Sequence, residues 1–346
     1  MNLLLSAAFV LTWSSGFIGA KLGAGSAGAL TILMWRFLPL AVVLLAVAAV
    51  RRAAWRGVTA RDLARQSVIG VLSQSGYLLS VYAAIQLGVS SGTTALIDGV
   101  QPLVAGALAG PLLHQYVSRR QWLGLGLGAA GVAVVTLADA ASGGSPGGPA
   151  GGVPWWAYAV PFLGMLALVA ATFLESRSRT RFAPAVPLTV HCTASAVVFS
   201  VLALCTGAAV PPPEASFWLA VGWLVVFATF GGYGLYWLVL RRRGVTAVNT
   251  LMFLMAPVTA VWGALMFGEP FSLRTAAGLA LGLVAVVVVH RDSGAAGGRG
   301  RGGGPRQDPP RTVVTGTPRS RMRRISATGR ASSTRTVSKS VSGASA

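Results

Sequence analysis

Residues 29–50 read ALTILMWRFLPLAVVLLAVAAV, an apolar run in which Arg36 is the only charged residue. At about 1.5 Å per residue, a helix of this length crosses the roughly 30 Å of hydrocarbon in a bilayer. Similar runs recur along the chain as far as residue 290, and only 10% of its residues are charged. Soluble domains carry about 25% charged residues. The sequence therefore predicts an all-α integral membrane protein.

Ten such runs are predicted to be transmembrane helices. Polar, glycine-rich or proline-rich segments separate them, and such segments favour the ends of helices. The predicted spans are residues 2–20, 29–50, 66–86, 92–113, 121–138, 155–174, 186–206, 217–239, 245–267 and 273–290.

The basic residues of the loops indicate how these spans are oriented. Alternate loops carry 13 basic residues, whereas the intervening loops carry only Lys21 and Arg274. Because short cytoplasmic loops are enriched in Lys and Arg, both termini are predicted to be cytoplasmic. Arg outnumbers Lys by 26 to 2. This bias is typical of GC-rich codon usage and favours a bacterial inner membrane.

The formal charge of +20 is unevenly distributed along the chain. Residues 291–346 hold 12 basic and 2 acidic residues, and thus half of the excess. This segment is rich in Gly, Ser, Arg and Pro, with too little apolar surface to offset the entropy of ordering it. We expect a disordered basic tail that lies near anionic lipid headgroups. No nucleic-acid partner is expected.

An internal repeat underlies the ten spans. Residues 115–124 match residues 269–278 in register, with the same residue type at three positions of each segment. Each half holds five spans, an odd number, so the second half is predicted to enter the membrane inverted. Inverted repeats recur in secondary transporters, where the substrate binds between the halves. The expected divisions are a first repeat (1–138), a Gly/Pro-rich extracytoplasmic linker (139–154), a second repeat (155–290) and the tail (291–346).

Several segments together carry a resemblance to a known family. The chain resembles the drug/metabolite transporter superfamily, in its EamA-type branch of ten-helix carriers with two five-helix repeats. The resemblance implies transport of small metabolites, often export of amino acids or related amines and acids. It also implies a cavity lined by helices 1–4 and 6–9. The matching segments are Trp13–Lys21, Trp35–Phe37, Gln74–Tyr77, Gln101–Leu103, Val117–Gly124, Ala256–Pro257 and Phe267–Pro270.

The chain departs from this family pattern at two places. After the fourth helix it has His114-Gln115 where the pattern has Gly-Glu, whereas the second half keeps Gly268-Glu269. It also has Asp98 where the pattern has a small apolar residue. Whatever the first glutamate does in relatives is lost or altered here.

Asp98 and Arg36 are the principal candidates for substrate binding. A charged side chain in hydrocarbon costs roughly 2.5–3.5 kcal/mol, so it normally faces protein or a water-filled cavity. Both residues are expected about 9–10 Å from the same membrane boundary. Two interpretations stay open. In the first, the two residues form an ion pair that only joins helices. In the second, Arg36 binds the carboxylate of a zwitterionic substrate, and Asp98 binds its ammonium group.

Five further residues on the predicted cavity helices are candidates for substrate binding. Trp13 and Tyr77 are expected near the midplane, either as core packing or as a wall against a ring or ammonium group. His191 occupies the second-half position that matches the arginine, where it either packs or takes part in proton coupling. Gln74 and Asn249 supply hydrogen-bonding groups that serve a substrate or join helices.

The sequence gives no sign of an enzyme. It has neither a Gly-x-Ser-x-Gly nor a His-Glu-x-x-His motif, and its three histidines and two cysteines are scattered. No catalytic residue, cofactor or metal site is expected. A gradient of the solute or of protons is expected to drive transport, because the chain has no Walker-type phosphate loop.

Two other interpretations of the sequence stay open. The chain could be a membrane scaffold or sensor that acts through its basic tail, or a flippase for lipid-like substrates. Gly124-x-x-x-Gly128 and Gly278-x-x-x-Gly282 predict close helix contacts, either within the chain or in a homodimer.

Overall fold

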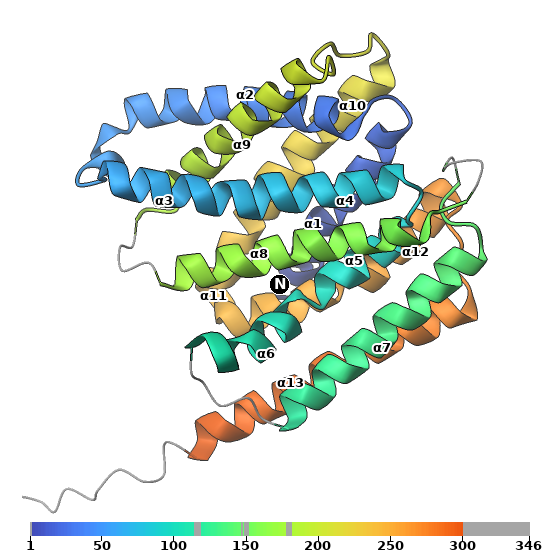
Figure 1. Cartoon of the computed structure of the whole chain (residues 1–346). Coiled ribbons are helices and arrows are strands. Elements are labelled where there is room, and N and C mark those ends of the chain that lie inside the picture. Colours follow the sequence, from blue (N-terminus) through green and yellow to red (C-terminus); the bar gives the residue numbers. More distant parts are fainter. Residues whose placement is uncertain (1, 114–118, 147, 149–151, 178–181, 300–346) are drawn as a thin grey trace, which may run out of the picture. The chain divides into compact units, whose positions relative to one another are not determined.

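Figure 1 shows the chain in a computed structural model that describes residues 2–113, 119–146, 148, 152–177 and 182–299. All regular elements within these ranges are helices, so the predicted all-α class is confirmed. The α-helices are α1 (Asn2–Ala24), α2 (Ala29–Val50), α3 (Ala60–Gly70), α4 (Tyr77–Gln86), α5 (Ser91–Gly99), α6 (Gln101–Leu113), α7 (Arg119–Ala141), α8 (Val160–Ser176), α9 (Ala185–Cys205), α10 (Ala215–Trp223), α11 (Gly232–Phe253), α12 (Met255–Phe267) and α13 (Leu273–Arg299). The short helices are η1 (Arg52–Trp55), η2 (Val71–Gly76), η3 (Trp155–Ala159) and η4 (Leu224–Gly231).

Seven helical segments in the described residues are long and apolar enough to cross a membrane. Two shorter apolar helices follow them, over Leu251–Phe267 and Leu273–Ala285. The predicted span 29–50 coincides with α2. The predicted span 92–113 is divided between α5 and α6.

Prolines accompany the breaks within two predicted spans. Val100 separates α5 from α6, and Pro102 follows two residues later. Leu254 separates α11 from α12, and Pro257 follows three residues later. Because proline lacks an amide N–H, it cannot continue the hydrogen-bond ladder of a helix. A proline thus lies within the first turn after the break in each half.

Two π-helical segments interrupt the third and eighth predicted spans. These are η2, which leads into α4, and η4, which leads into α11. π-Helical turns are rare and are often found at functional sites. Both segments lie at the middle of their spans and carry polar side chains that are described below.

Some boundaries differ from those that the sequence predicts. The loop expected at residues 240–244 falls inside α11, because arginine is a good helix former and its run continues the helix. α13 continues to Arg299, past the boundary expected at 290. The remaining tail, like residues 114–118, lies outside the described residues.

The described loops gather at two opposite ends of the helices. The basic end holds residues 51–59, Arg177 and residues 182–184, on the left of Figure 1. The linker end holds residues 87–90, 142–146 and 268–272, on the right of Figure 1.

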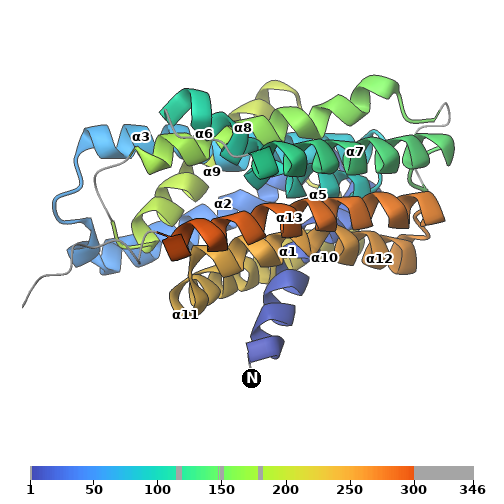
Figure 2. The same ribbon diagram turned by 90° about the horizontal axis from the view of Figure 1, so that it is seen from below.

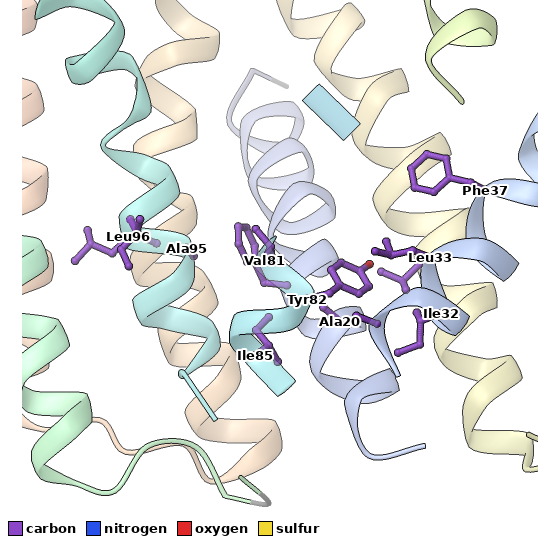
Figure 3. Close-up of a cluster of buried hydrophobic side chains, with 14 of the residues drawn as sticks. Ala20, Ile32, Leu33, Phe37, Val81, Tyr82, Ile85, Ala95 and Leu96 are labelled. Atoms are coloured by element: carbon purple, nitrogen blue, oxygen red, sulfur yellow. The ribbon is translucent and has the colours of Figure 1, made fainter. Parts of the chain in front are cut away.

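The largest apolar core joins helices from both halves of the chain. Figure 3 shows part of it, where Leu33 and Phe37 of α2 lie near Tyr82 of α4. Phe199 of α9 stacks on Phe37 with ring centroids 5.6 Å apart. Water does not reach this apolar core. A polar side chain buried among these residues therefore needs a hydrogen-bond partner within the protein.

Helices α7 and α13 run side by side, as both Figure 1 and Figure 2 show. Their backbones approach closely at Gly131 and Gly278. A Cβ atom on Gly131 would lie 2.7 Å from the carbonyl oxygen of Gly278, and one on Gly278 would lie 2.8 Å from that of Gly131. The small residues at 278 and 282 thus serve packing within the chain.

We expect Gly131→Ala to destabilise the protein by about 1–3 kcal/mol, because the added methyl group meets backbone atoms that cannot move aside. Thermal unfolding in detergent measures this loss. Gly126→Ala on the same helix is the matched control, because a Cβ there meets nothing within 4 Å. Equal melting temperatures for the two variants would contradict this account of the α7–α13 contact.

Candidate functional site

A group of polar side chains lies among the apolar helices at the centre of the spans. We call it the central polar site. Its members come from α2, η2, α4, α5, η4 and α11, so both halves of the chain contribute. They are Arg36, Gln74, Tyr77, Tyr82, Asp98, Thr229 and Tyr233.

Arg36 is the charged centre of this site and is 5% exposed. Its Nη1 donates to the Tyr82 hydroxyl at 2.8 Å, and its Nη2 donates to Thr229 Oγ1 at 3.2 Å. Thr229 belongs to η4, so the π-helical segment of the second half holds the arginine of the first half. The buried Nε of Arg36 has no hydrogen-bond partner. The Nε–H donor of the guanidinium is therefore unpaired.

Asp98 is the acidic member and lies in α5, two residues before the break at Val100. Its Oδ2 accepts a hydrogen bond of 2.8 Å from the Tyr77 hydroxyl. Its Oδ1 is buried without a partner. In the described part of the chain, Arg36 and Asp98 thus have separate partners and form no ion pair with each other. This differs from the interpretation in which they only join two helices.

Gln74 links the two halves a second time. Its Nε2 donates to the Tyr233 hydroxyl at 3.0 Å, and its Oε1 accepts from Ser195 Oγ at 3.4 Å. Gln74 lies within η2, and Tyr233 follows η4. Each π-helical segment therefore contributes to a hydrogen bond with the opposite half.

Trp13 borders the site on its aromatic side. Its ring lies edge-on to Tyr233 at 5.9 Å and packs against Tyr236 at 5.8 Å and Phe9 at 5.7 Å. Phe9 is fully buried. The indole is thus a packing residue that also neighbours the polar groups, and its role as a wall against a substrate stays a prediction.

His191 lies nearer the basic end and bonds elsewhere. Its Nε2 and Gln66 Oε1 are 2.7 Å apart, and Gln66 Nε2 donates to Glu175 Oε2 at 2.9 Å. Because the amide oxygen of Gln66 can only accept, the imidazole Nε2 carries a proton here. No hydrogen bond joins His191 to Arg36 or Asp98. The Asn249 side chain lies outside the described residues.

Three members of the central polar site were not among the sequence candidates: Tyr82, Thr229 and Tyr233. The sequence does carry a signal for Tyr233. Gly76-Tyr77 in the first half recurs as Gly232-Tyr233 in the second half, and the spacing between the two pairs equals the spacing between Gly88 and Gly244. Tyr82 and Thr229 give no comparable signal, since their roles depend on contact with Arg36.

Comparison with known proteins agrees with this architecture. The sequence model of the EamA-like transporter family matches residues 1–137 and matches a second time over residues 155–291. The chain belongs to the EamA-like transporter family. The resemblance that the sequence carried is thereby confirmed. This EamA-like protein is a multi-pass membrane protein, and its family indicates a transporter of small molecules rather than an enzyme.

Solved structures share the fold of this EamA-like transporter. Fourteen chains of known structure match it. One of them, described as "Crystal structure of protein", is 19% identical with a TM-score of 0.56, and the match covers 85% of this chain and 97% of that chain. The search of curated proteins gave no match.

We expect Tyr82→Phe in this EamA-like transporter to lower the free energy of unfolding by about 1–3 kcal/mol, because it leaves a buried charged donor without a partner. Thermal unfolding in detergent measures the change. Tyr236→Phe is the control, since no hydrogen bond of the Tyr236 hydroxyl is seen in the described residues and its ring also packs in an aromatic cluster. An equal effect of both variants would contradict the role of Tyr82.

Proposed function

We propose that this protein is a secondary-active transporter that exports amino acids or related amines and acids by alternating access. The proposal rests on the unpaired polar atoms of Arg36 and Asp98. A buried guanidinium and a buried carboxylate each retain one unpaired polar atom, Nε in one and Oδ1 in the other. Leaving such atoms unpaired is costly, so a ligand that satisfies them gains that free energy on binding.

A zwitterionic substrate has complementary groups for these two residues. Its carboxylate suits the planar fork of Arg36, and its ammonium group suits Asp98 Oδ1. Tyr77 and Tyr82 orient the two charged residues through the hydrogen bonds described above. The arrangement favours a small substrate that carries both charges.

The topology completes the proposal. Ten spans, arranged as two inverted five-helix repeats of residues 1–138 and 155–290, would place the central polar site between the halves, near the midplane. The arginine-rich basic end would face the cytoplasm with both termini, in a bacterial inner membrane. Coupling to protons is part of the same hypothesis. Partners are the substrate and anionic lipids, with a homodimer as a further hypothesis.

The direct test is counterflow of labelled amino acids, amines and carboxylic acids into proteoliposomes, with and without a pH gradient. Wild type is expected to show saturable counterflow of a zwitterion. Arg36→Lys is expected to weaken apparent affinity roughly tenfold, because an ammonium cannot reproduce the planar fork of donors. Glu214→Gln is the control, since Glu214 is exposed in the loop before α10.

Asp98→Asn distinguishes two roles of the carboxylate. If Asp98 binds the ammonium group, the variant loses binding of amines and zwitterions. If proton-linked transport disappears while binding persists, the ammonium role is wrong and Asp98 carries the proton. Absence of saturable counterflow for every solute, from folded wild-type protein, would contradict the proposal and favour a lipid-like substrate.

We expect deletion of residues 301–346 to leave counterflow unchanged, because the hydrogen bonds that hold Arg36 and Asp98 in the central polar site come from residues of α4 and η4, which lie before residue 301. The same proteoliposome assay measures this. Loss of function on deletion, with the remaining chain folded, would favour the scaffold or sensor interpretation.

A further inference from the structure

A second polar cluster lies at the linker end, away from the central polar site. Glu269 follows α12, and its side chain is 5% exposed. Both carboxylate oxygens accept from the backbone N–H of Ser91 at 3.1 Å, and Oε2 also accepts from Ser91 Oγ at 2.6 Å. Oε1 accepts from Ser145 Oγ at 2.9 Å. We call Glu269, Ser91 and Ser145 the linker-end lock.

This lock joins segments that are far apart in the sequence. Ser91 is the first residue of α5, so Glu269 from the second half binds the N-terminal amide of a helix in the first half. A carboxylate at a helix N-terminus is favoured by the helix dipole as well as by the hydrogen bonds. Ser145 attaches the linker between the halves to the same carboxylate. All of its described partners thus lie outside the second half.

Helices α5 and α12 approach each other closely beside the linker-end lock. A Cβ atom on Gly92 of α5 would lie 2.6 Å from Ala260 Cβ of α12, so the two helices approach through small side chains. Small residues at such a contact let two membrane helices approach closely. The linker-end lock therefore lies beside a close contact between α5 and α12.

Two other charged residues face the lock. Asp139 of α7 accepts from the Ser90 backbone N–H at 3.1 Å, beside the N–H that Glu269 uses. Lys21 Nζ donates to the Pro146 carbonyl at 2.9 Å and interacts electrostatically with both carboxylates. The single cation partly balances the two acids.

The basic end carries a counterpart. Gln66 of the first half is 2% exposed and bonds to both His191 and Glu175 of the second half, as described above. A Cβ atom on Gly70 would lie 2.6 Å from His191 Cα, so α3 and α9 also meet at a glycine. We call Gln66, His191 and Glu175 the basic-end lock. Each end is therefore closed by one glycine contact and one polar lock between the halves.

We propose that Glu269 is a positioning residue that holds α5 against α12 and so closes the linker end of the substrate path. The proposal rests on the proposed transport function. The linker-end lock breaks when that end opens, while the basic-end lock holds, and the reverse happens in the other half of the cycle. The structure, with both locks formed, is the closed state between them.

Polar locks suit this task because of where they lie. At an end of the spans, water enters when the helices part and replaces the hydrogen bonds of Glu269 one for one. Because exchange with water makes the net loss per hydrogen bond small, the lock can open and close reversibly. The same groups at the centre of the bilayer would meet no water and could not separate cheaply.

The test uses a cysteine that the chain already has. Cys192 is buried, and its side chain interacts with Gln74 and Arg36 of the central polar site. With Cys205 replaced by Ala, a charged, membrane-impermeant methanethiosulfonate reaches Cys192 only through an open end. Its reaction rate is measured in proteoliposomes of uniform orientation, with reagent on one side at a time and with no substrate present.

Glu269→Ala is expected to raise the rate from the linker side at least tenfold and to lower it from the basic side. Gln66→Ala is expected to do the opposite. Glu214→Ala removes an exposed glutamate near the start of α10 and is expected to change neither rate. Ser145→Ala removes one hydrogen bond and is expected to act in the same direction as Glu269→Ala, by a smaller factor. If Glu269→Ala does not fold, the reaction rates of Ser145→Ala from the two sides test the proposal in its place.

Any other pattern overturns the proposal. A faster reaction from both sides would mean that Glu269 only stabilises the fold, and an unchanged rate would mean that the lock does not close the path. Because no substrate is used, these outcomes are independent of the counterflow assay. Opposite changes on the two sides, together with failed counterflow, would retain the gate and reject the proposed substrates.

Discussion

A guanidinium buried among membrane helices has to keep its hydrogen bonds, and the arrangement at Arg36 follows from that requirement. The cost of an unpaired charge in hydrocarbon exceeds what apolar packing at one site returns. Tyr82 and Thr229 supply acceptors from two different halves of the chain. The π-helical geometry of η4 places Thr229 within reach. The arginine thereby joins α2 to α4 and η4.

Polar contacts between the halves occur at three levels of the spans. The linker-end lock, the central polar site and the basic-end lock each join residues of both halves, with apolar core between them. Apolar side chains supply most of the buried contact but little specificity, because lipid is as apolar as they are. Hydrogen bonds between the halves therefore decide how the helices are aligned. In the proposed transport cycle, hydrogen bonds near the ends exchange with water, and the unpaired atoms of Arg36 and Asp98 at the centre bind the substrate.

The sequence indicated several residues of the central polar site, but it did not indicate which of them contact each other. It selected Arg36, Gln74, Tyr77 and Asp98, all of which contribute to the central polar site. The cost of polar groups in hydrocarbon makes such residues conspicuous in an apolar run. It left out Tyr82 and Thr229, which are ordinary residue types in such runs and become important only beside a guanidinium. It also took the arginines at 241–243 for a loop, although they continue α11.

The sequence by itself determined the all-α class, most of the span positions and the basic residues at one end. The physical reason is that span length and hydropathy respond to the thickness of the bilayer, which is the same for every segment. Only the tertiary structure decided which polar atoms meet. Glu269 and Ser91 are 178 residues apart, and Arg36 and Thr229 are 193 apart. Such pairs depend on the rotation of each helix about its axis and on close contacts at glycines, and both result from packing all of the helices together.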